Sequence, residues 1–357
     1  MMRELISEYH RLAAGGPVGR AVVTSVWGSA PRPEGACLIA RTDGTMAGSV
    51  SGGCVESAVV EEIGIALLRG TPRLTRFSVS NETAWGVGLA CGGTIEILIE
   101  PTVRPGLLNA AARGGVVVAT VVAGPSPHGS HWLISDEGQT EGPVLPADTL
   151  LDEPSQVLPQ LRDLETHIIP RAREALRRQA SFAFDVPGQH GEPERVFLEF
   201  FPRQSTLLIF GATHVAIHLA SLARKLGYRI IVADGRAAFL TAERFPDADE
   251  LILAWPEEAF ARVGIDRGTC VCILSHDPKF DESALEIALR SDAAYVGAIG
   301  SKSTQLARRE RLAVQGFAPE EIARLHGPIG LDLGGREPSE IALAILAEMT
   351  MVRHGKA

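Results

Sequence analysis

The sequence predicts an α/β fold in two parts, a mixed α/β domain over residues 1–200 and a doubly wound parallel sheet over residues 201–357. Two observations support this prediction. A chain of 357 residues is longer than one hydrophobic core usually serves. From about Ser205 onward, short apolar strand patterns alternate with helical patterns, which is typical of a parallel sheet covered on both faces.

The first hundred residues combine helix and strand patterns. An amphipathic helix is expected over residues 1–14, and a second helix follows the glycine-rich segment GSVSGGCVE and ends near Leu68. Strands rich in branched residues are expected at 18–27, 36–41, 74–80 and 94–100. Glycine is dense in residues 86–93, between the last two of these strands.

The middle of the N-terminal part, residues 102–200, carries no chemical motif. Strands are expected at 116–123 and 131–135, and a charged helix at 155–180 with a break at Pro170. We interpret this stretch as a lid or as the outer layer of the first domain.

The C-terminal part shows the regular alternation. Strands are expected at 206–210, 228–233, 250–254, 270–274 and 294–299, and helices at 214–226, 256–263, 281–290, 301–315 and 338–354. The first strand ends in GATHVA, residues 211–216, where a Rossmann-like domain carries its G-x-G-x-x-G/A fingerprint. Asp234 ends the second strand, where a ribose-binding carboxylate is expected. Thr213 replaces the second glycine, which disfavours NAD(P).

Polar residues follow the carboxyl ends of several expected strands. Those ends form one crevice in an open parallel sheet, and ligands bind there. The candidate binding residues in this crevice are Gly211, Thr213, His214, Asp234, Arg236, His276, Asp277, Gly300, Ser301 and Asp332. We expect Asp234 and His276 to be exposed, and Asp281 either to cap the following helix or to join the site.

Two loops in the first part place a thiol beside a Gly-Gly pair. They are Gly52-Gly53-Cys54 and Cys91-Gly92-Gly93, and all six residues are candidate binding residues. Cys54 is the candidate metal ligand, because a thiolate is a soft donor and the helix that begins near Val55 adds positive potential there. The alternative is that these glycines make tight turns and the thiols are packing residues.

The remaining cysteines and the overall charge bear on compartment and partners. Cys270 and Cys272 lie two apart on an apolar strand, so a buried core pair is expected. Five cysteines in a chain of this length do not indicate a disulfide framework, and a cytoplasmic location is expected. The net charge of −9 argues against nucleic acid as a partner, and no apolar run is long enough to predict a membrane span.

Eight segments, in order along the chain, resemble the xanthine dehydrogenase accessory proteins of the XdhC/CoxI family. They are WGSAPRP (27–33), GSVSGGCVE (48–56), ACGGTIEILIEP (90–101), LIFGATHVA (208–216), IVADGR (231–236), LSHDPKFD (274–281), YVGAIGS (295–301) and HGPIGLDLG (326–334). Thr213 and Ala90 stand where the family usually has glycine.

The resemblance implies a maturation factor rather than a metabolic enzyme. Such a factor binds the molybdenum cofactor, as molybdopterin or its cytosine dinucleotide, and favours its sulfuration by a cysteine desulfurase. It then delivers the cofactor to a xanthine dehydrogenase-like molybdenum hydroxylase. The competing hypothesis is an NAD(P)-dependent oxidoreductase or a nucleotide-sensing regulator. A homodimer remains open.

Overall fold

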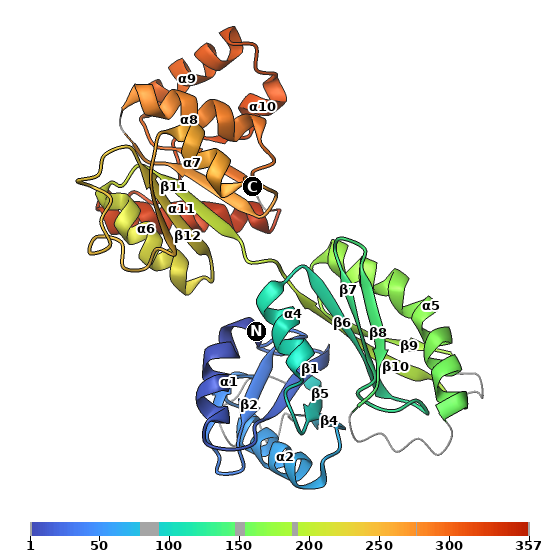
Figure 1. Ribbon diagram of the computed structural model, residues 1–357. Helices are drawn as coiled ribbons and strands as arrows, with labels where there is room; N and C mark the ends of the chain where they lie inside the picture. Colours follow the sequence, from blue (N-terminus) through green and yellow to red (C-terminus); the bar gives the residue numbers. More distant parts are fainter. Residues whose placement is uncertain (1, 79–92, 147–153, 188–191, 276, 356–357) are drawn as a thin grey trace. The chain divides into compact units, whose positions relative to one another are not determined.

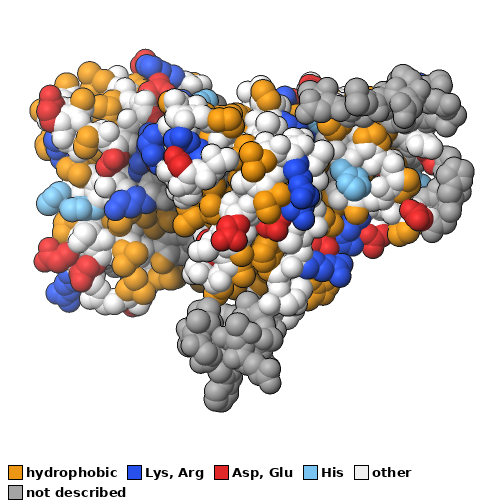
Figure 2. Space-filling model, turned by 90° about the horizontal axis from the view of Figure 1, so that it is seen from below, with side chains coloured by type: hydrophobic (Ala, Val, Ile, Leu, Met, Phe, Trp, Pro, Cys, Tyr) orange, Lys and Arg blue, Asp and Glu red, His pale blue; other side chains and the backbone are white. Residues whose placement is uncertain are grey.

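The structure is a computed structural model that describes residues 2–78, 93–146, 154–187, 192–275 and 277–355. The chain divides into two compact units, Met1–Arg203 and Gln204–Ala357, each with its own hydrophobic clusters. Among the described residues, no helix is both long and apolar enough to cross a membrane. On the face drawn in Figure 2, acidic and basic side chains are interspersed.

The first unit begins with an antiparallel five-stranded sheet. The 3-10 helix η1 (Met2–Leu5) and helix α1 (Ile6–Ala13) precede it, and α2 (Glu56–Arg69) covers one of its faces. The strand order is β3 (Met46–Gly48), β2 (Cys37–Ala40), β1 (Gly19–Trp27), β5 (Thr94–Glu100) and β4 (Arg73–Ser78). Val23 on β1 and Ile97 on β5 pack with Ile63 of α2, because alternate residues of a strand face the same side.

Residues 102–200 form a second antiparallel sheet with its own helices. The strand order is β8 (Thr140–Val144), β7 (His131–Ser135), β6 (Val116–Ala123), β10 (Glu194–Phe201) and β9 (Phe182–Val186). Helix α4 (Pro105–Arg113) precedes β6, and α5 (Pro154–Arg178) covers the outer face of this sheet (Figure 1).

The expected break at Pro170 is wrong, because α5 continues through it. Leu164, Ile168 and Ala172 are buried against the sheet on both sides of the proline. Pro170 itself is exposed. The apolar face therefore holds the helix together although the proline removes one backbone N–H.

The two sheets of the first unit pack against each other through the opposite faces. Val22 and Leu98 from the first sheet contact Val122 and Phe197 from the second. Arg20 lies in the same layer, fully buried, and donates to Glu100 at 2.6 Å and to Glu199. The interior of this sandwich therefore contains paired charges as well as apolar side chains.

The second unit confirms the predicted doubly wound sheet. Six parallel strands lie in the order β13 (Glu250–Leu253), β12 (Arg229–Asp234), β11 (Thr206–Phe210), β14 (Thr269–Ile273), β15 (Tyr295–Ala298) and β16 (Leu325–His326). Helices α6 (His214–Lys225) and α11 (Pro338–Arg353) pack on one face. Helices α7 (Pro256–Val263) and α8 (Pro278–Arg290) pack on the other, with α9 (Lys302–Val314) and α10 (Pro319–Ala323) beside α8.

Cys270 and Cys272 lie in the core beneath α6 and α11, so the expectation of a buried pair is confirmed. Burial raises the pKa of the Cys270 thiol to about 11. Neither thiol is a candidate for ionisation near neutral pH.

Candidate functional site

The glycine-cysteine loop of the first unit is folded around the carboxylate of Glu56, the first residue of α2. One carboxylate oxygen accepts from the Ser49 hydroxyl at 2.7 Å and from the backbone N–H groups of Val50, Ser51 and Gly52 at 2.9–3.2 Å. The other accepts from the Ser51 hydroxyl at 2.5 Å and from the Gly53 N–H at 2.9 Å. The protein thus supplies its own anion to the backbone donors of this loop.

The electrostatics of the loop follow from this arrangement. Burial opposes the charge on Glu56, but hydrogen bonds from Ser51 and Ser49 outweigh it and hold the pKa of this carboxyl at about 2. The Ser51 hydroxyl oxygen in turn accepts the N–H groups of Cys54 and Val55, both at 3.0 Å. The positive end of α2 is therefore balanced by Glu56 before its potential reaches the Cys54 thiol.

The glycines of this loop are needed for backbone conformation, and they leave space above it. Gly52 has φ +81° and Gly53 has φ +114°, where other residues are strained. A Cβ at Gly53 would meet nothing within 4 Å, and one at Gly52 would meet only Pro31 at 3.7 Å. Cys54 is partly exposed beside this space and is a free thiol.

Three of the segments that resemble the XdhC/CoxI family meet at this end of the first sheet. Gly52 lies beside Pro31, and a Cβ on Gly93 would come within 2.3 Å of the Ser29 carbonyl oxygen. Gly93 therefore permits backbone packing rather than ligand approach. Cys91 and Gly92 lie outside the described residues. No group of three or more potential metal-ligating side chains occurs in the described part of the chain, so Cys54 has no such cluster around it.

The crevice of the second unit is organised by Asp234 at the end of β12. Its carboxylate accepts the backbone N–H of Ala212 at 2.7 Å and the Nε and Nη2 of Arg236, each at 2.9 Å. Burial raises the pKa of Asp234, but the Arg236 and Ala212 hydrogen bonds outweigh it and leave the pKa below the ordinary value.

The expectation that Asp234 is exposed is wrong, because the residue is only 3% exposed. Its oxygens are occupied by the glycine loop and by Arg236, since the short connection after β12 turns the guanidinium back onto the carboxylate. Asp234 therefore tethers the end of β12 to the loop after β11.

The glycine loop after β11 packs closely on the end of β14. A Cβ on Gly211, which has φ +105°, would lie 2.4 Å from the backbone nitrogen of Ser275. Thr213 is the residue before α6, and its hydroxyl is buried and has no partner among the described residues. His214 begins α6 and contacts His218, with ring centroids 5.1 Å apart.

Two other crevice candidates are helix caps. Asp277 accepts the Lys279 N–H at 3.0 Å at the start of α8, and Ser301 accepts the Thr304 N–H at 3.2 Å at the start of α9. The expected capping role of Asp281 is wrong, because this side chain is buried and forms an ion pair with Arg308 at 2.7 Å. The cap falls on Asp277 since Pro278 begins the helix one turn earlier than expected.

Of the remaining crevice candidates, the structure describes Gly300 and Asp332. Gly300, with φ +140°, lies near the Gln305 amide. Asp332 is exposed in the loop between β16 and α11. His276 lies outside the described residues.

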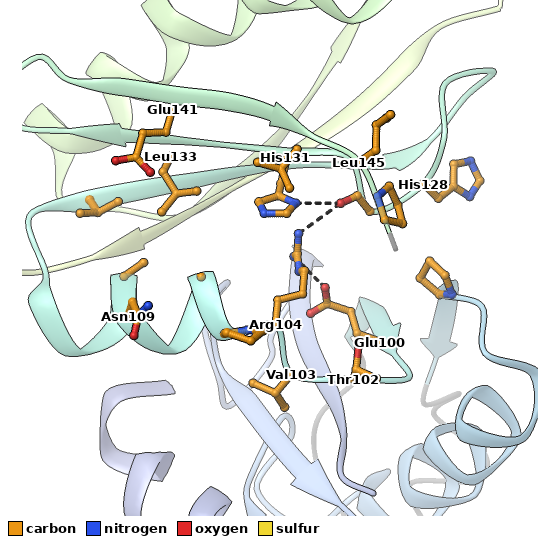
Figure 3. A pocket seen from close by; sticks show the side chains of 18 of the residues that line it. Glu100, Thr102, Val103, Arg104, Asn109, His128, His131, Leu133, Glu141 and Leu145 are labelled. Atoms are coloured by element: carbon orange, nitrogen blue, oxygen red, sulfur yellow. Dashed lines mark hydrogen bonds and ion pairs between the residues drawn. The ribbon is translucent and has the colours of Figure 1, made fainter. Parts of the chain in front are cut away.

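Sequence reasoning missed a cavity of about 700 Å³ within the first unit (Figure 3). Its polar side chains include Glu100, Arg104 and His131. The lining comes from segments that are separate in sequence, and no spacing rule joins them. The feature of the sequence that could have indicated a polar interior is the presence of Glu100 and Arg20, both buried, on strands that are otherwise apolar.

Comparison with known proteins gives consistent results. Residues 207–349 match the XdhC Rossmann domain, and residues 11–78 match the XdhC and CoxI family. A Bacillus subtilis protein named as a probable xanthine dehydrogenase subunit is 27% identical over 93% of this chain and 92% of its own length. The molybdenum cofactor insertion chaperone PaoD of Escherichia coli is 26% identical over 94% of this chain and 84% of its own.

A solved structure also shares the fold. A crystal structure from Bacillus halodurans, described as a xanthine dehydrogenase, superposes with a TM-score of 0.73 at 24% identity, covering 99% of this chain and 96% of that one. The two family matches together span more than half of the sequence and fall in both units. The chain belongs to the XdhC and CoxI family.

Proposed function

We propose that this protein binds the molybdenum cofactor as cargo through Cys54, favours its sulfuration, and delivers it to a molybdenum hydroxylase. The observation that carries the proposal is the preformed loop at Glu56. It leaves the Cys54 thiol partly exposed beside open space at Gly53. A relative named as a molybdenum cofactor insertion chaperone supports the same role.

The chemistry of the loop suits a metal that already has sulfur ligands. The Cys54 thiolate is a soft donor and would supply one further ligand to such a metal without a protein cluster. Because Glu56 already accepts the loop's N–H groups, an anionic group of the cargo gains little from the backbone there. We therefore assign the metal end to Cys54 and leave the form of the cofactor, molybdopterin or the cytosine dinucleotide, to the binding assay.

The partners in this proposal are a cysteine desulfurase, which supplies the sulfur, and a xanthine dehydrogenase-like hydroxylase as client. A homodimer would present two thiol loops. The alternative of an NAD(P) oxidoreductase is weakened by Asp234, whose oxygens are occupied by Ala212 and Arg236 and so are not available to a ribose.

Comparing cysteine variants tests the role of Cys54. Protein purified from cells that make the cofactor should contain molybdenum and a pterin that fluoresces after oxidation. Cys54→Ser should fold normally and retain several-fold less molybdenum, since a hydroxyl is a hard, poorly ionised donor. Client enzyme matured with it should be deficient in sulfurated cofactor.

Cys270→Ser, at a core thiol, is the control and should change stability only. Cys91→Ser should have a smaller effect than Cys54→Ser, because the proposal assigns the metal to Cys54. If Cys54→Ser equals the wild type in both metal content and client activity, the metal end of the proposal is wrong. Micromolar binding of NADH without binding of pterin would favour the oxidoreductase.

A further inference from the structure

The cavity of the first unit lies far from the thiol loop. It is lined by residues from the connection after α2, from the end of β5 to the start of β6, and from the turn before β7 to the segment after β8. Gly70, at its edge, follows the last residue of α2, whereas Cys54 precedes the first. Fourteen helical residues rising 1.5 Å each separate the two by about 20 Å. The cavity is therefore a second site, and its volume of about 700 Å³ lies within the range of small-molecule pockets.

His131 supplies a hydrogen-bond acceptor to this cavity. The side chain is buried, and its Nδ1 lies 3.1 Å from the carbonyl oxygen of Gly129. A carbonyl only accepts, so Nδ1 carries the proton. Burial, followed by the charge of Arg104, lowers the pKa of His131 to about 4, so the ring is neutral at neutral pH. Nε2 then has a free lone pair, and it has no partner among the described residues.

Arg104 supplies donors beside this acceptor. Its Nη2 donates to Glu100 at 2.7 Å and to Thr120 at 3.3 Å, and its Nη1 donates to the Gly129 carbonyl at 3.2 Å. A guanidinium has five N–H groups, so some remain, and Nε is buried with no partner among the described residues. Arg104 and His131 both bond to the Gly129 carbonyl oxygen, through Nη1 and Nδ1, so the guanidinium and the imidazole are neighbours at the cavity wall (Figure 3).

The charges around the cavity balance without a ligand. Glu100 accepts from Arg104 through one oxygen and from Arg20 through the other, and Arg20 also binds Glu199. Two guanidinium groups therefore face two carboxylates. Glu141 adds a further carboxylate to the lining, and Arg113, which also lines the cavity, forms an ion pair with Glu137 at 3.5 Å. A phosphate or carboxylate ligand would find no uncompensated positive charge here, so the site favours an uncharged ligand.

The rest of the lining is suited to an apolar body. Val103, Ala110, Val116, Leu133 and Leu145 contribute apolar side chains to the lining. Apolar walls with a few convergent polar groups are the usual composition of a site for a small organic molecule.

We propose that this cavity binds an uncharged planar heterocycle with a lactam edge, meaning an N–H next to a C=O. The ligand N–H donates to Nε2 of His131, and the ligand carbonyl accepts from Arg104. The ring body packs against the aliphatic side chains. The proposal does not depend on cargo binding at Cys54.

Three matched probes test the site on the full-length wild-type protein by calorimetry. Quinazolin-4-one has the lactam edge, its N3-methyl derivative keeps the carbonyl without the N–H, and quinazoline has neither. We expect quinazolin-4-one to bind about tenfold more tightly than either of the others, as each satisfied buried hydrogen bond contributes about that factor. Inorganic phosphate should not bind.

Variants then test whether the preference for quinazolin-4-one depends on the imidazole of His131. In His131→Leu the roughly tenfold preference for quinazolin-4-one over its N-methyl derivative should disappear. His128→Leu is the matched control, because this histidine also lines the cavity but is exposed and bonded through Nε2 to the Gly124 carbonyl. It should keep the preference. Leu133→Trp, which places a larger side chain in the cavity while keeping Glu100, Arg104 and His131, should abolish binding of all three probes.

Several outcomes would overturn the proposal. They are equal affinity for the three probes, no binding of quinazolin-4-one at millimolar concentration, tighter binding of phosphate, or a preference that survives in His131→Leu. The probe series uses the wild-type protein, so it decides the matter even if His131→Leu does not fold. Loss of molybdenum in Cys54→Ser has no bearing on these results, so the two proposals fail separately.

Discussion

Glu56 is the residue on which the thiol loop depends most. Its pKa is about 2 in the folded protein against an ordinary value of 4.5, so its contribution to stability is complete above about pH 4.5 and is lost as the pH falls toward 2. The full effect is on the order of 3 kcal/mol. Glu56→Gln should lower the free energy of unfolding at pH 7 by about 2–4 kcal/mol. The reason is that the NH₂ group of the glutamine would face backbone N–H groups, and two donors do not bond to each other.

Chemical denaturation at several pH values measures this effect. Glu61→Gln, at an exposed carboxylate on the same helix, is the control and should behave like the wild type. If Glu56→Gln keeps the wild-type stability at pH 7, the carboxylate does not hold the loop.

Asp234 provides a second prediction. Asp234→Ala removes the acceptor for the Ala212 N–H and leaves Arg236 without its ion-pair partner. A loss of about 1–3 kcal/mol in the free energy of unfolding is expected, since a buried N–H becomes unsatisfied. Urea denaturation of the wild type and the variant checks this. Unchanged stability, together with a loss of nucleotide binding, would return Asp234 to the role that the sequence pattern indicated.

Helix α5 allows a prediction about an element. Pro170 interrupts its hydrogen bonding at an exposed position between buried Ile168 and Ala172. Pro170→Ala should restore a backbone hydrogen bond and raise the free energy of unfolding by about 1–3 kcal/mol, with part of the gain offset by a more flexible unfolded chain. An upward shift of Tm would be the sign of this gain, and a fall in Tm would mean that the kink itself is required for packing.

The sequence predicted best those elements whose side chains all lie in one kind of environment. The parallel strands of the second unit are buried on both faces, so they appear as continuous apolar runs. Strand β10 was missed, because Glu194, Arg195 and Glu199 interrupt its apolar pattern. All three are paired in the folded protein, and the partners lie up to 179 positions away in sequence, as for Arg20 and Glu199.

The candidate site was also predicted only in part from the sequence. The position of Asp234 after its strand was predictable, but the return of Arg236 onto it depends on side-chain geometry. The residues of the GSVSGGCVE segment were identified, whereas the role of Glu56 as the anion inside the loop was not. The sequence places the loop only a few positions before the carboxylate of Glu56. That the backbone N–H groups of the loop point at this carboxylate depends on the positive φ of Gly52 and Gly53.

At the level of the whole chain, the two units should fold independently. Each has its own core, and β11 begins at Thr206, three residues after the first unit ends at Arg203. The Arg203 ion pair with Asp136 stays within the first unit. A fragment of residues 204–357 should therefore unfold in one cooperative thermal transition, as small single domains do. A fragment without such a transition in circular dichroism would mean that the first unit is needed to complete the second.

The hydrogen bonding inside the loop at Glu56 has a consequence for the proposed binding of cargo. All backbone N–H groups from Val50 to Val55 already have acceptors inside the protein. If Cys54 binds the metal as proposed, the cargo would be held there mainly by one metal–sulfur bond. Its residence time would then be set by how readily an incoming ligand replaces a single thiolate, and release would need no rearrangement of the loop. Such an arrangement would favour rapid transfer over tight retention.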